Sequence, residues 1–254
     1  MRFNSSHPQK SKYVKELKHY IGLIKDSKLR DKVSSFLTDI NMTFDGKNYS
    51  VDFENAPASK RQHHSFPSGL LIHMIATTKF ALAMADVLEN YYHATLNRDL
   101  IIAGSLLHDI MKPITYDESN GGSYSMSGLG ERLDHISLAV AELYKRDFPL
   151  DLIHIVASHH GTSGPTWPKS LEAWVVHFAD YVDSQFVGIT MQTSQGLLKS
   201  IVKSNVKIES PELMFLIFQT AFYKGREAVV KLWESKLKND KRIKIGANTE
   251  SPKT

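Results

Sequence analysis

The sequence predicts an all-α fold, a helical bundle with one or two short β-hairpins. Apolar residues recur at helical spacing through most of the 254 residues, and 42% apolar content is enough to fill a core. Asp45-Gly46 and the Gly-rich stretch 119–122 each lie between short segments of extended character, which is typical of hairpin turns. Several predicted helices also carry His or Asp residues, which a bundle can direct toward a common centre.

The first third of the chain is expected to hold N-terminal helices over 11–40 and a hairpin over 42–51. Val14, Leu17 and Ile21 follow helical spacing, and Asp26-Ser27 can divide the segment into two helices. Residues 55–67 contain two prolines and are expected to form a loop. Residues 1–12 are polar and are expected to fray.

The central helices are predicted over 69–90 and 98–108. Asn97 can cap the second of these, and Pro113 ends it. Because the helix over 98–108 is apolar nearly all round, we expect it to lie at the centre of the fold. The remaining helices are predicted over 133–146, 150–158, 170–187, 212–223 and 225–238.

These elements predict one domain over 1–254, with no internal repeat. Its core is expected over about 56–190, between N-terminal helices over 11–40 and C-terminal helices over 210–238. The charged tail over 239–254 is expected to be disordered. The sequence does not indicate an oligomeric state.

Composition narrows the possible chemistry. The chain has no Cys, which excludes thiolate metal sites, disulfides and Cys nucleophiles. Its net charge of +4 suits an anionic ligand, although two solvated helix faces would explain the basic residues near both ends equally well. We expect a soluble, cytoplasmic protein without a membrane segment, because the apolar runs are short and interrupted.

The dyad His108-Asp109 stands at the end of the apolar run 100–107. Burying an unpaired charge there costs several kcal/mol, and a bound divalent cation would compensate it. Imidazole nitrogen and carboxylate oxygen are both good metal ligands. A single buried His is more often a satisfied core residue, so the prediction depends on further members of the set. These are His73, His135, His159, His160 and Asp180, on or beside separate predicted helices.

We predict that His73, His108, Asp109 and Asp180 hold one metal ion. His135, His159 and His160 could complete a second site or bind substrate beside a single ion. The donor set suits Mn, Fe, Mg, Ni, Co or Zn, and such centres hydrolyse phosphate esters. We assign catalytic roles to Asp109, Lys112 and His135, although Lys112 could also be a solvated side chain.

The substrate is predicted to be a nucleotide or a single-stranded nucleic acid. Lys60, His64 and Lys112 are the expected substrate-binding residues. Aromatic residues of the neighbouring loops, Tyr116, Tyr124 and Trp167, could stack on bases or simply pack those loops.

The order His73, His108-Asp109, Asp180 resembles the signature of the HD-domain superfamily of metal-dependent phosphohydrolases. His135 with His159-His160 is similar to the extended signature that holds two metals. Residues 56–60, His63-His64 and 69–73 look most like the HD domain of the YhaM-type 3′–5′ exoribonucleases. The resemblance implies an all-helical domain, a divalent metal and phosphodiesterase or 3′–5′ exonuclease activity.

The chain departs from that family pattern in three places. Met111 and Asp134 stand where the family usually has glycine. Because the segment before residue 56 is short, we also expect no N-terminal nucleic-acid module like that of those exoribonucleases, and this expectation favours nucleotides or short oligonucleotides as substrates. The alternative is a non-catalytic, metal-stabilised regulatory module that binds nucleotides or RNA.

Overall fold

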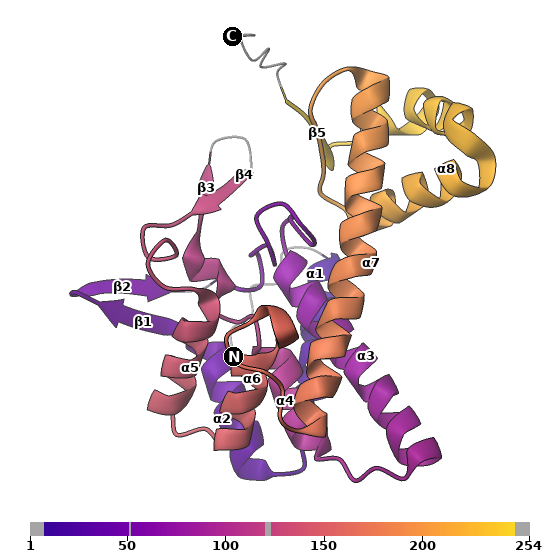
Figure 1. The fold of residues 1–254 in the computed structure, drawn as a ribbon. Helices are drawn as coiled ribbons and strands as arrows, with labels where there is room; N and C mark the ends of the chain where they lie inside the picture. The colour runs from indigo at the N-terminus through magenta and orange to yellow at the C-terminus, as the bar shows by residue number, and fades with distance from the viewer. Residues whose placement is uncertain (1–7, 51, 120–122, 247–254) are drawn as a thin grey trace.

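The computed structural model describes residues 8–50, 52–119 and 123–246, which form helices and three short antiparallel strand pairs (Figure 1). The all-α prediction is confirmed. The described α-helices are α1 (Pro8–Leu23), α2 (Ser27–Thr38), α3 (Gly69–Tyr92), α4 (Arg98–Leu107), α5 (His135–Lys145), α6 (Leu150–Ser158), α7 (Leu171–Val202) and α8 (Pro211–Leu232). Short 3-10 helices span Lys112–Thr115 and Gly161–Ser163.

Both predicted hairpins are present. β1 (Asn41–Phe44) pairs with β2 (Lys47–Ser50), and Asp45 and Gly46 between them have φ of 50° and 74°. Positive φ at both turn positions matches the right-handed twist of the paired strands. β3 (Tyr116–Ser119) pairs with β4 (Ser123–Met126). The expected Gly-rich tip over 120–122, the end of the tail over 247–254 and the first seven residues lie outside the described residues.

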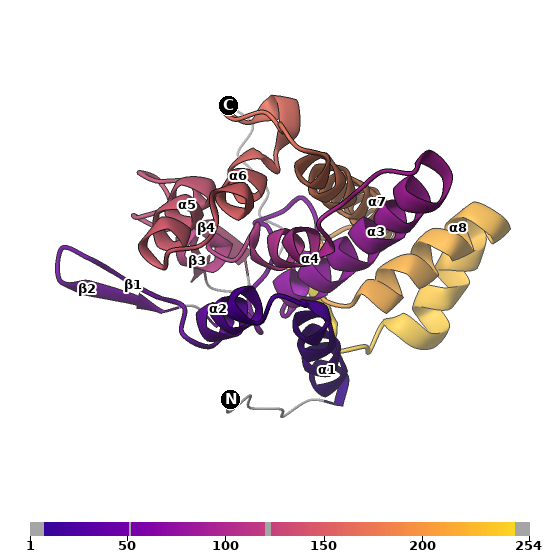
Figure 2. The same ribbon diagram turned by 90° about the horizontal axis from the view of Figure 1, so that it is seen from below.

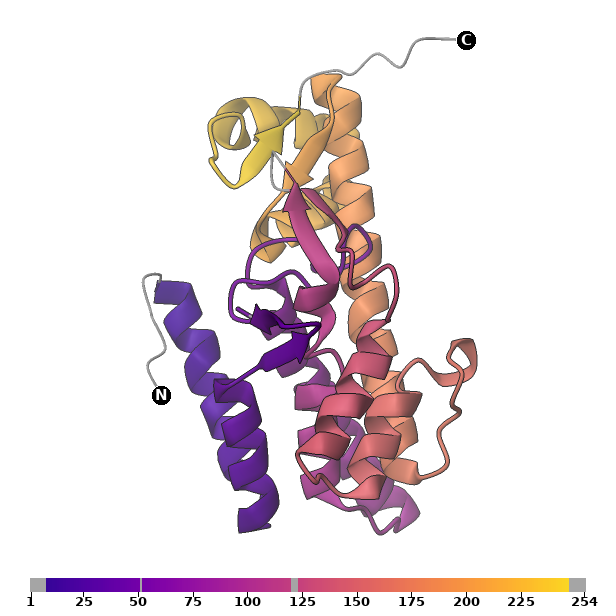
Figure 3. The same cartoon turned by 90° about the vertical axis from the view of Figure 1, so that its left-hand side faces the viewer.

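Three helices surround the position of the predicted site. α4 packs against both α3 and α7, and these three helices lie side by side when viewed from below (Figure 2). Every residue of α4 from Ile101 to Leu107 is buried, which confirms its predicted central place. α1 and α2 cover one side of this group (Figure 3). In the described part of the chain, only α3 is apolar and long enough to span a membrane, and half of its apolar window is buried in the protein.

The C-terminal part differs from the prediction in two respects. α7 continues to Val202 because Met191, Ser194 and Leu198 are buried, and the Ser194 hydroxyl donates to the carbonyl of Met214 on α8 at 2.7 Å. The segment expected to be disordered from residue 239 contains β6 (Ile243–Ile245), which pairs with β5 (Val206–Ile208). The break predicted between two late helices falls at Gly225, where φ is 78° inside α8.

The loop before α3 is held in a strained conformation. His64 and Ser68 have left-handed φ of 46° and 61°, which non-glycine residues seldom adopt. Backbone hydrogen bonds secure the loop, from Ala58 to the His64 carbonyl at 3.1 Å and from Leu70 to the Ala56 carbonyl at 3.0 Å. The His64 carbonyl also occupies the space in which a Cβ of Gly69 would stand, 2.1 Å from that position. Glycine at position 69 is therefore a requirement of this loop.

Replacing Gly69 with alanine should destabilise the protein by about 1–3 kcal/mol, the cost of overpacking. The new methyl group cannot avoid the His64 carbonyl without moving the loop. Urea unfolding monitored by circular dichroism measures the effect. Gly196→Ala is the matched control, because a Cβ there meets nothing within 4 Å and lies inside α7. The control substitution should leave the free energy of unfolding unchanged or raise it by up to about 1 kcal/mol. Equal free energies of unfolding for the two variants would contradict the requirement for glycine at position 69.

Candidate metal centre

Five elements deliver the predicted ligands to one place. His73 lies on α3, His108 caps the end of α4 with Asp109 after it, and Asp180 lies on α7. His135 is the first residue of α5, and His159 caps the end of α6. Helix ends thus provide most of the set, since a side chain at a terminus can reach the bundle centre without crossing a neighbouring helix. His73, His108, Asp109 and His159 are completely buried.

One group of ligand atoms surrounds the Nε2 of His73. The Nε2 of His108 is 3.1 Å away, Oδ1 of Asp180 is 3.1 Å away and Oδ2 of Asp109 is 3.4 Å away. The His108 Nε2 is likewise 3.4 Å from the same Asp109 oxygen. Two nitrogens and two carboxylate oxygens therefore converge, as the sequence predicts for the first metal shell.

Hydrogen bonds behind these ligands fix which nitrogens face inward. Nδ1 of His108 donates to the Ser105 carbonyl at 2.9 Å, and Nδ1 of His73 donates to Oδ2 of Asp183 at 2.6 Å. A neutral imidazole carries one N–H, so both Nε2 atoms present lone pairs to each other. Two lone pairs at 3.1 Å repel unless a cation lies between them. The donor set therefore fits a metal ion.

The electrostatics of His73 support the same interpretation. Burial lowers the pKa of His73, but hydrogen bonds to Asp109, Asp180 and Asp183 outweigh this effect and raise the pKa well above its usual value. The carboxylates thus stabilise a positive charge at this point. Without an ion, a proton on His73 supplies that charge, and a divalent ion would replace it.

The second carboxylate oxygen of Asp109 faces a different group. Its Oδ1 is 3.3 Å from Nε2 of His135 and 3.5 Å from Nε2 of His159. All three atoms are buried without a hydrogen-bond partner among the described residues. Nδ1 of His159 donates to the Val156 carbonyl at 2.7 Å, so its Nε2 is again a free lone pair. Unpartnered buried acceptors of this kind are costly, and a cation would satisfy them.

His160 adjoins this second group. Its ring centroid is 4.3 Å from that of His159 and 5.1 Å from that of His135. One nitrogen of each of these three histidines lies within 4.8 Å of the others, which is compatible with a shared ion. The two oxygens of Asp109 face one group each, so its carboxylate is placed to bridge them.

The two positions at which this chain lacks the family's usual glycine, Asp134 and Met111, have local explanations. Asp134 is the N-cap of α5, and its carboxylate accepts from the backbone of Ser137 at 2.7 Å. It therefore fixes the start of the helix that presents His135. Met111 is fully buried and has φ of −93°, a conformation open to any residue. Neither substitution removes a ligand.

The predicted substrate-binding residues occupy different surroundings. Lys112 is buried, and its Nζ donates to Oδ2 of Asp109 at 2.5 Å. Lys60 is partly exposed in the loop before α3. His64 is fully buried behind His73, with ring centroids 5.2 Å apart, and its Nε2 is 3.5 Å from Oδ2 of Asp183. Of the three, Lys112 lies closest to the ligand groups.

A cavity of about 720 Å³ opens over the second ligand group and Asp180. That volume lies within the range of small-molecule sites. Neutral polar side chains dominate its wall, and Lys112 is the only Lys or Arg among the described residues that lines it. The polar lining residues outside the ligand set are Ser59, Gln62, His63, Tyr116, Ser163, His177, Tyr181, Ser184, Gln185 and Gln192.

Two residues beside the ligands were not among the sequence-predicted site residues. Asp183 orients His73, and His63 lines the cavity. The i, i+3 spacing of Asp180 and Asp183 on one helix face is the signal that could have indicated Asp183. His63 gives no comparable signal, because its place depends on the folding of an irregular loop.

The ligand geometry agrees with comparisons to known proteins. Residues 70–185 match the HD domain family, a range that includes His73, His108-Asp109 and Asp180. The chain is also similar to a dihydroneopterin 2′,3′-cyclic phosphate phosphodiesterase of Methanocaldococcus jannaschii, at 42% identity over 217 residues, covering 85% of this chain and 87% of that protein. The chain belongs to the HD domain family. It is a metal-dependent phosphohydrolase of that family.

Other HD domain relatives are exoribonucleases, which confirms the resemblance seen in the sequence. The 3′–5′ exoribonuclease YhaM of Listeria innocua is 29% identical over 225 residues. The match covers 84% of this chain and 64% of the exoribonuclease. The corresponding protein of Bacillus subtilis is 33% identical over 150 residues, 55% of this chain and 46% of its own length. No solved structure matches the chain significantly.

Asp183→Asn should weaken metal affinity by about 10- to 100-fold, the usual effect of removing a partner that orients a ligand. An amide can donate to Nδ1 of His73, and the ring hydrogen would then move to the nitrogen that faces the metal. Titration with Mn²⁺ under equilibrium dialysis measures the affinity. Asp31→Asn, at an exposed position of α2, is the control and should bind like the wild type. Equal affinity of both variants would contradict the role of Asp183.

Proposed function

We propose that this protein is a metal-dependent phosphodiesterase that opens a 2′,3′-cyclic phosphate carried by a small heterocyclic molecule. The observation that carries the proposal is Asp109, whose two oxygens face separate groups of metal-ligating atoms beside a cavity of about 720 Å³. A cavity of that size suits a single pterin or nucleoside with its phosphate. The similarity to a dihydroneopterin 2′,3′-cyclic phosphate phosphodiesterase supports the same substrate class.

Two ions are proposed, although the donor set does not select their identity. His73, His108, Asp180 and one oxygen of Asp109 would hold the first ion. His135, His159, His160 and the other oxygen of Asp109 would hold the second. Divalent ions in such a site supply a nucleophilic water at neutral pH and positive charge beside phosphoryl oxygens.

Residues of the cavity wall would orient the phosphodiester. Lys112 is held by Asp109 and can donate to a phosphate oxygen as a point charge. In the overall reaction, the oxygen of one water bonds to phosphorus and one ester P–O bond breaks. The released oxygen takes a proton and becomes a hydroxyl, and the product is a phosphomonoester on the neighbouring oxygen.

The charge of the cavity supports a small substrate over a long strand. Proteins that follow a nucleic-acid backbone contact several phosphates with Lys and Arg. Among the described residues a single Lys lines the cavity, and it is already paired with a carboxylate. One phosphate is the charge that this wall can accommodate.

We further infer a cytoplasmic location, as expected from the sequence.

A 3′–5′ exoribonuclease is the second candidate, favoured by a neighbouring hollow. That hollow, of about 610 Å³, contains Lys60 and Arg61 and shares Gln62 and Tyr116 with the main cavity. Tyr124 also lines it and could stack on a base, whereas Trp167 is exposed and lines neither space. A strand of two or three nucleotides could extend from one space into the other.

A substrate panel tests the proposal. The protein is freed of metal, reloaded separately with Mn, Fe, Co, Ni, Zn or Mg, and assayed on dihydroneopterin 2′,3′-cyclic phosphate and adenosine 2′,3′-cyclic phosphate. A single-stranded RNA oligonucleotide and p-nitrophenyl phosphate complete the panel. We expect kcat/KM for a cyclic phosphate to exceed that for the other two classes by at least about 100-fold, and chelation to abolish turnover. Higher kcat/KM on the RNA would favour the exoribonuclease, and activity confined to the monoester would contradict both.

A further inference from the structure

We propose that His63 is a substrate-binding residue whose Nε2 accepts a hydrogen bond from a hydroxyl or ring N–H of the substrate. The proposal deepens the proposed function, because it adds a specificity contact beside the metal centre. His63 lines the cavity together with Gln62 and Lys112, and its ring centroid is 5.0 Å from that of the metal ligand His73. A group bound there would lie next to the reacting phosphate.

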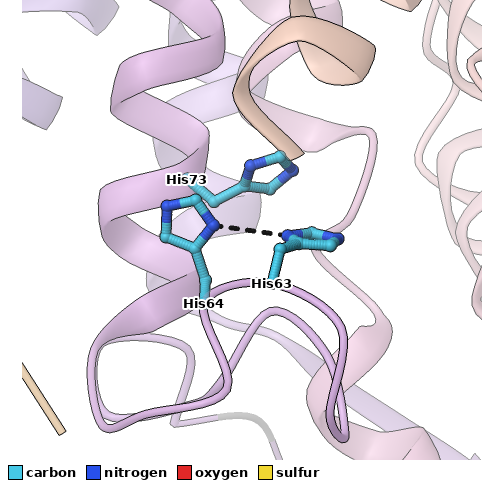
Figure 4. A group of neighbouring side chains, drawn as sticks. All are labelled: His63, His64 and His73. Carbon is cyan, nitrogen blue, oxygen red and sulfur yellow. Dashed lines mark hydrogen bonds between the residues drawn. The ribbon is translucent and has the colours of Figure 1, made fainter. Parts of the chain in front are cut away.

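Contacts that run from Asp183 through His64 determine which ring nitrogen of His63 carries the hydrogen. Figure 4 shows His63 and His64 facing each other from the loop beneath His73, with their Nδ1 atoms 3.3 Å apart. On the other side of His64, Nε2 faces the Asp183 carboxylate at 3.5 Å. This separation is longer than a good hydrogen bond, but a lone pair on Nε2 would face a carboxylate oxygen and be repelled, so the favoured tautomer of His64 carries the N–H on Nε2 and leaves Nδ1 as an acceptor.

The position of the ring hydrogen on His63 follows from that on His64. Since Nδ1 of His64 accepts, Nδ1 of His63 must donate to it. The Nε2 of a neutral His63 is then a lone pair, and it has no hydrogen-bond partner among the described residues. A lone pair repels phosphate oxygens and attracts O–H or N–H groups. The wall therefore offers a cation at Lys112 for the phosphate and an acceptor at His63 for the remainder of the molecule.

The loop is built to hold this pair in place. The Ser59 hydroxyl accepts from the backbone N–H of Gln62 and of His63, both at 3.0 Å, and donates to the His63 carbonyl at 2.6 Å. The next residue, His64, has the left-handed φ of 46° that Gly69 makes possible. Strained backbone persists where the surroundings enforce it, and such positions concentrate at ligand sites.

Paired substitutions test the contact. His63→Leu removes the acceptor and should raise KM for the best cyclic phosphate about tenfold, the effect of one lost hydrogen bond. It should leave kcat within about threefold and the bound metal unchanged. His63→Gln places an amide oxygen at similar reach and should recover most of the lost affinity. His19→Gln, on the exposed face of α1, is the control for the glutamine substitution.

Several outcomes would overturn the proposal. These are an unchanged KM in His63→Leu, a loss of metal from that variant, or a His63→Gln variant as weak as His63→Leu. Absence of wild-type turnover on every cyclic phosphate is a different result, because it rejects the proposed function rather than the role of His63. A measurement without substrate decides the role of His63 in that case.

That measurement is the protonation pattern of the His63 ring. Nitrogen-15 NMR of histidine-labelled protein loaded with diamagnetic Zn²⁺ separates protonated from unprotonated ring nitrogens, and His63→Gln assigns the signals. We expect a protonated Nδ1 and an unprotonated Nε2 on His63. A protonated Nε2 would make it a donor and overturn the proposed acceptor, whatever the substrate.

Discussion

Asp109→Ala is expected to abolish hydrolysis, with kcat/KM falling on the order of 10⁴-fold or more, equivalent to roughly 5 kcal/mol of transition-state stabilisation. The reason is that one carboxylate serves both ligand groups, with Oδ2 3.4 Å from His73 and Oδ1 3.3 Å from His135. Its loss removes the carboxylate that the described residues bring to the second group and leaves Lys112 without its carboxylate partner in a buried place. Both metal content and turnover should therefore collapse.

The measurement is metal analysis of the purified variant together with kcat/KM on the best cyclic phosphate. Asp31→Ala is the matched control, since it removes an exposed carboxylate from the interior of α2 and should leave both quantities unchanged. A cooperative thermal transition confirms that the variant is folded. Full metal content in folded Asp109→Ala protein would contradict the bridging role.

His135→Ala should lower the metal stoichiometry by one ion and reduce kcat by about 10²- to 10³-fold, within the range that one catalytic group contributes. His135 is one of two histidines that face Oδ1 of Asp109. The first group around His73 is untouched by this change, so one ion should remain. Metal titration of the variant beside the wild type gives the stoichiometry.

The control for His135→Ala is His19→Ala, which removes an exposed imidazole outside the cavity and should bind metal as the wild type does. An unchanged stoichiometry in His135→Ala would contradict a second ion. His135 would then contact substrate beside a single ion, which is the alternative that the sequence leaves open.

Much of both ligand groups could be predicted because local rules determine where several of their residues lie. The apolar run of α4 ends at His108-Asp109, and Asp134 caps the helix that begins with His135. These boundaries depend on caps and breakers that act within a few residues. The two hairpins follow from local signals in the same way, as the positive φ of Asp45 and Gly46 illustrates.

Other features depend on contacts between distant segments. β6 follows a charged stretch with no strand pattern, and it is ordered because it pairs with β5 some 35 residues earlier. The part of α7 beyond residue 187 contains two glycines and is helical because its buried face packs against α8. The pairing of His64 with Asp183 joins the loop before α3 to α7, and no periodicity within either segment indicates it. Tertiary packing overrides local propensity in such places.

Anomalous diffraction from Mn-soaked crystals would show whether Asp109 bridges two metal ions. We expect two anomalous peaks, one on either side of the Asp109 carboxylate. One peak should contact His73, His108 and Asp180, and the other should contact His135 and His159. A single peak, or peaks that do not contact Asp109, at full Mn²⁺ saturation would contradict the account.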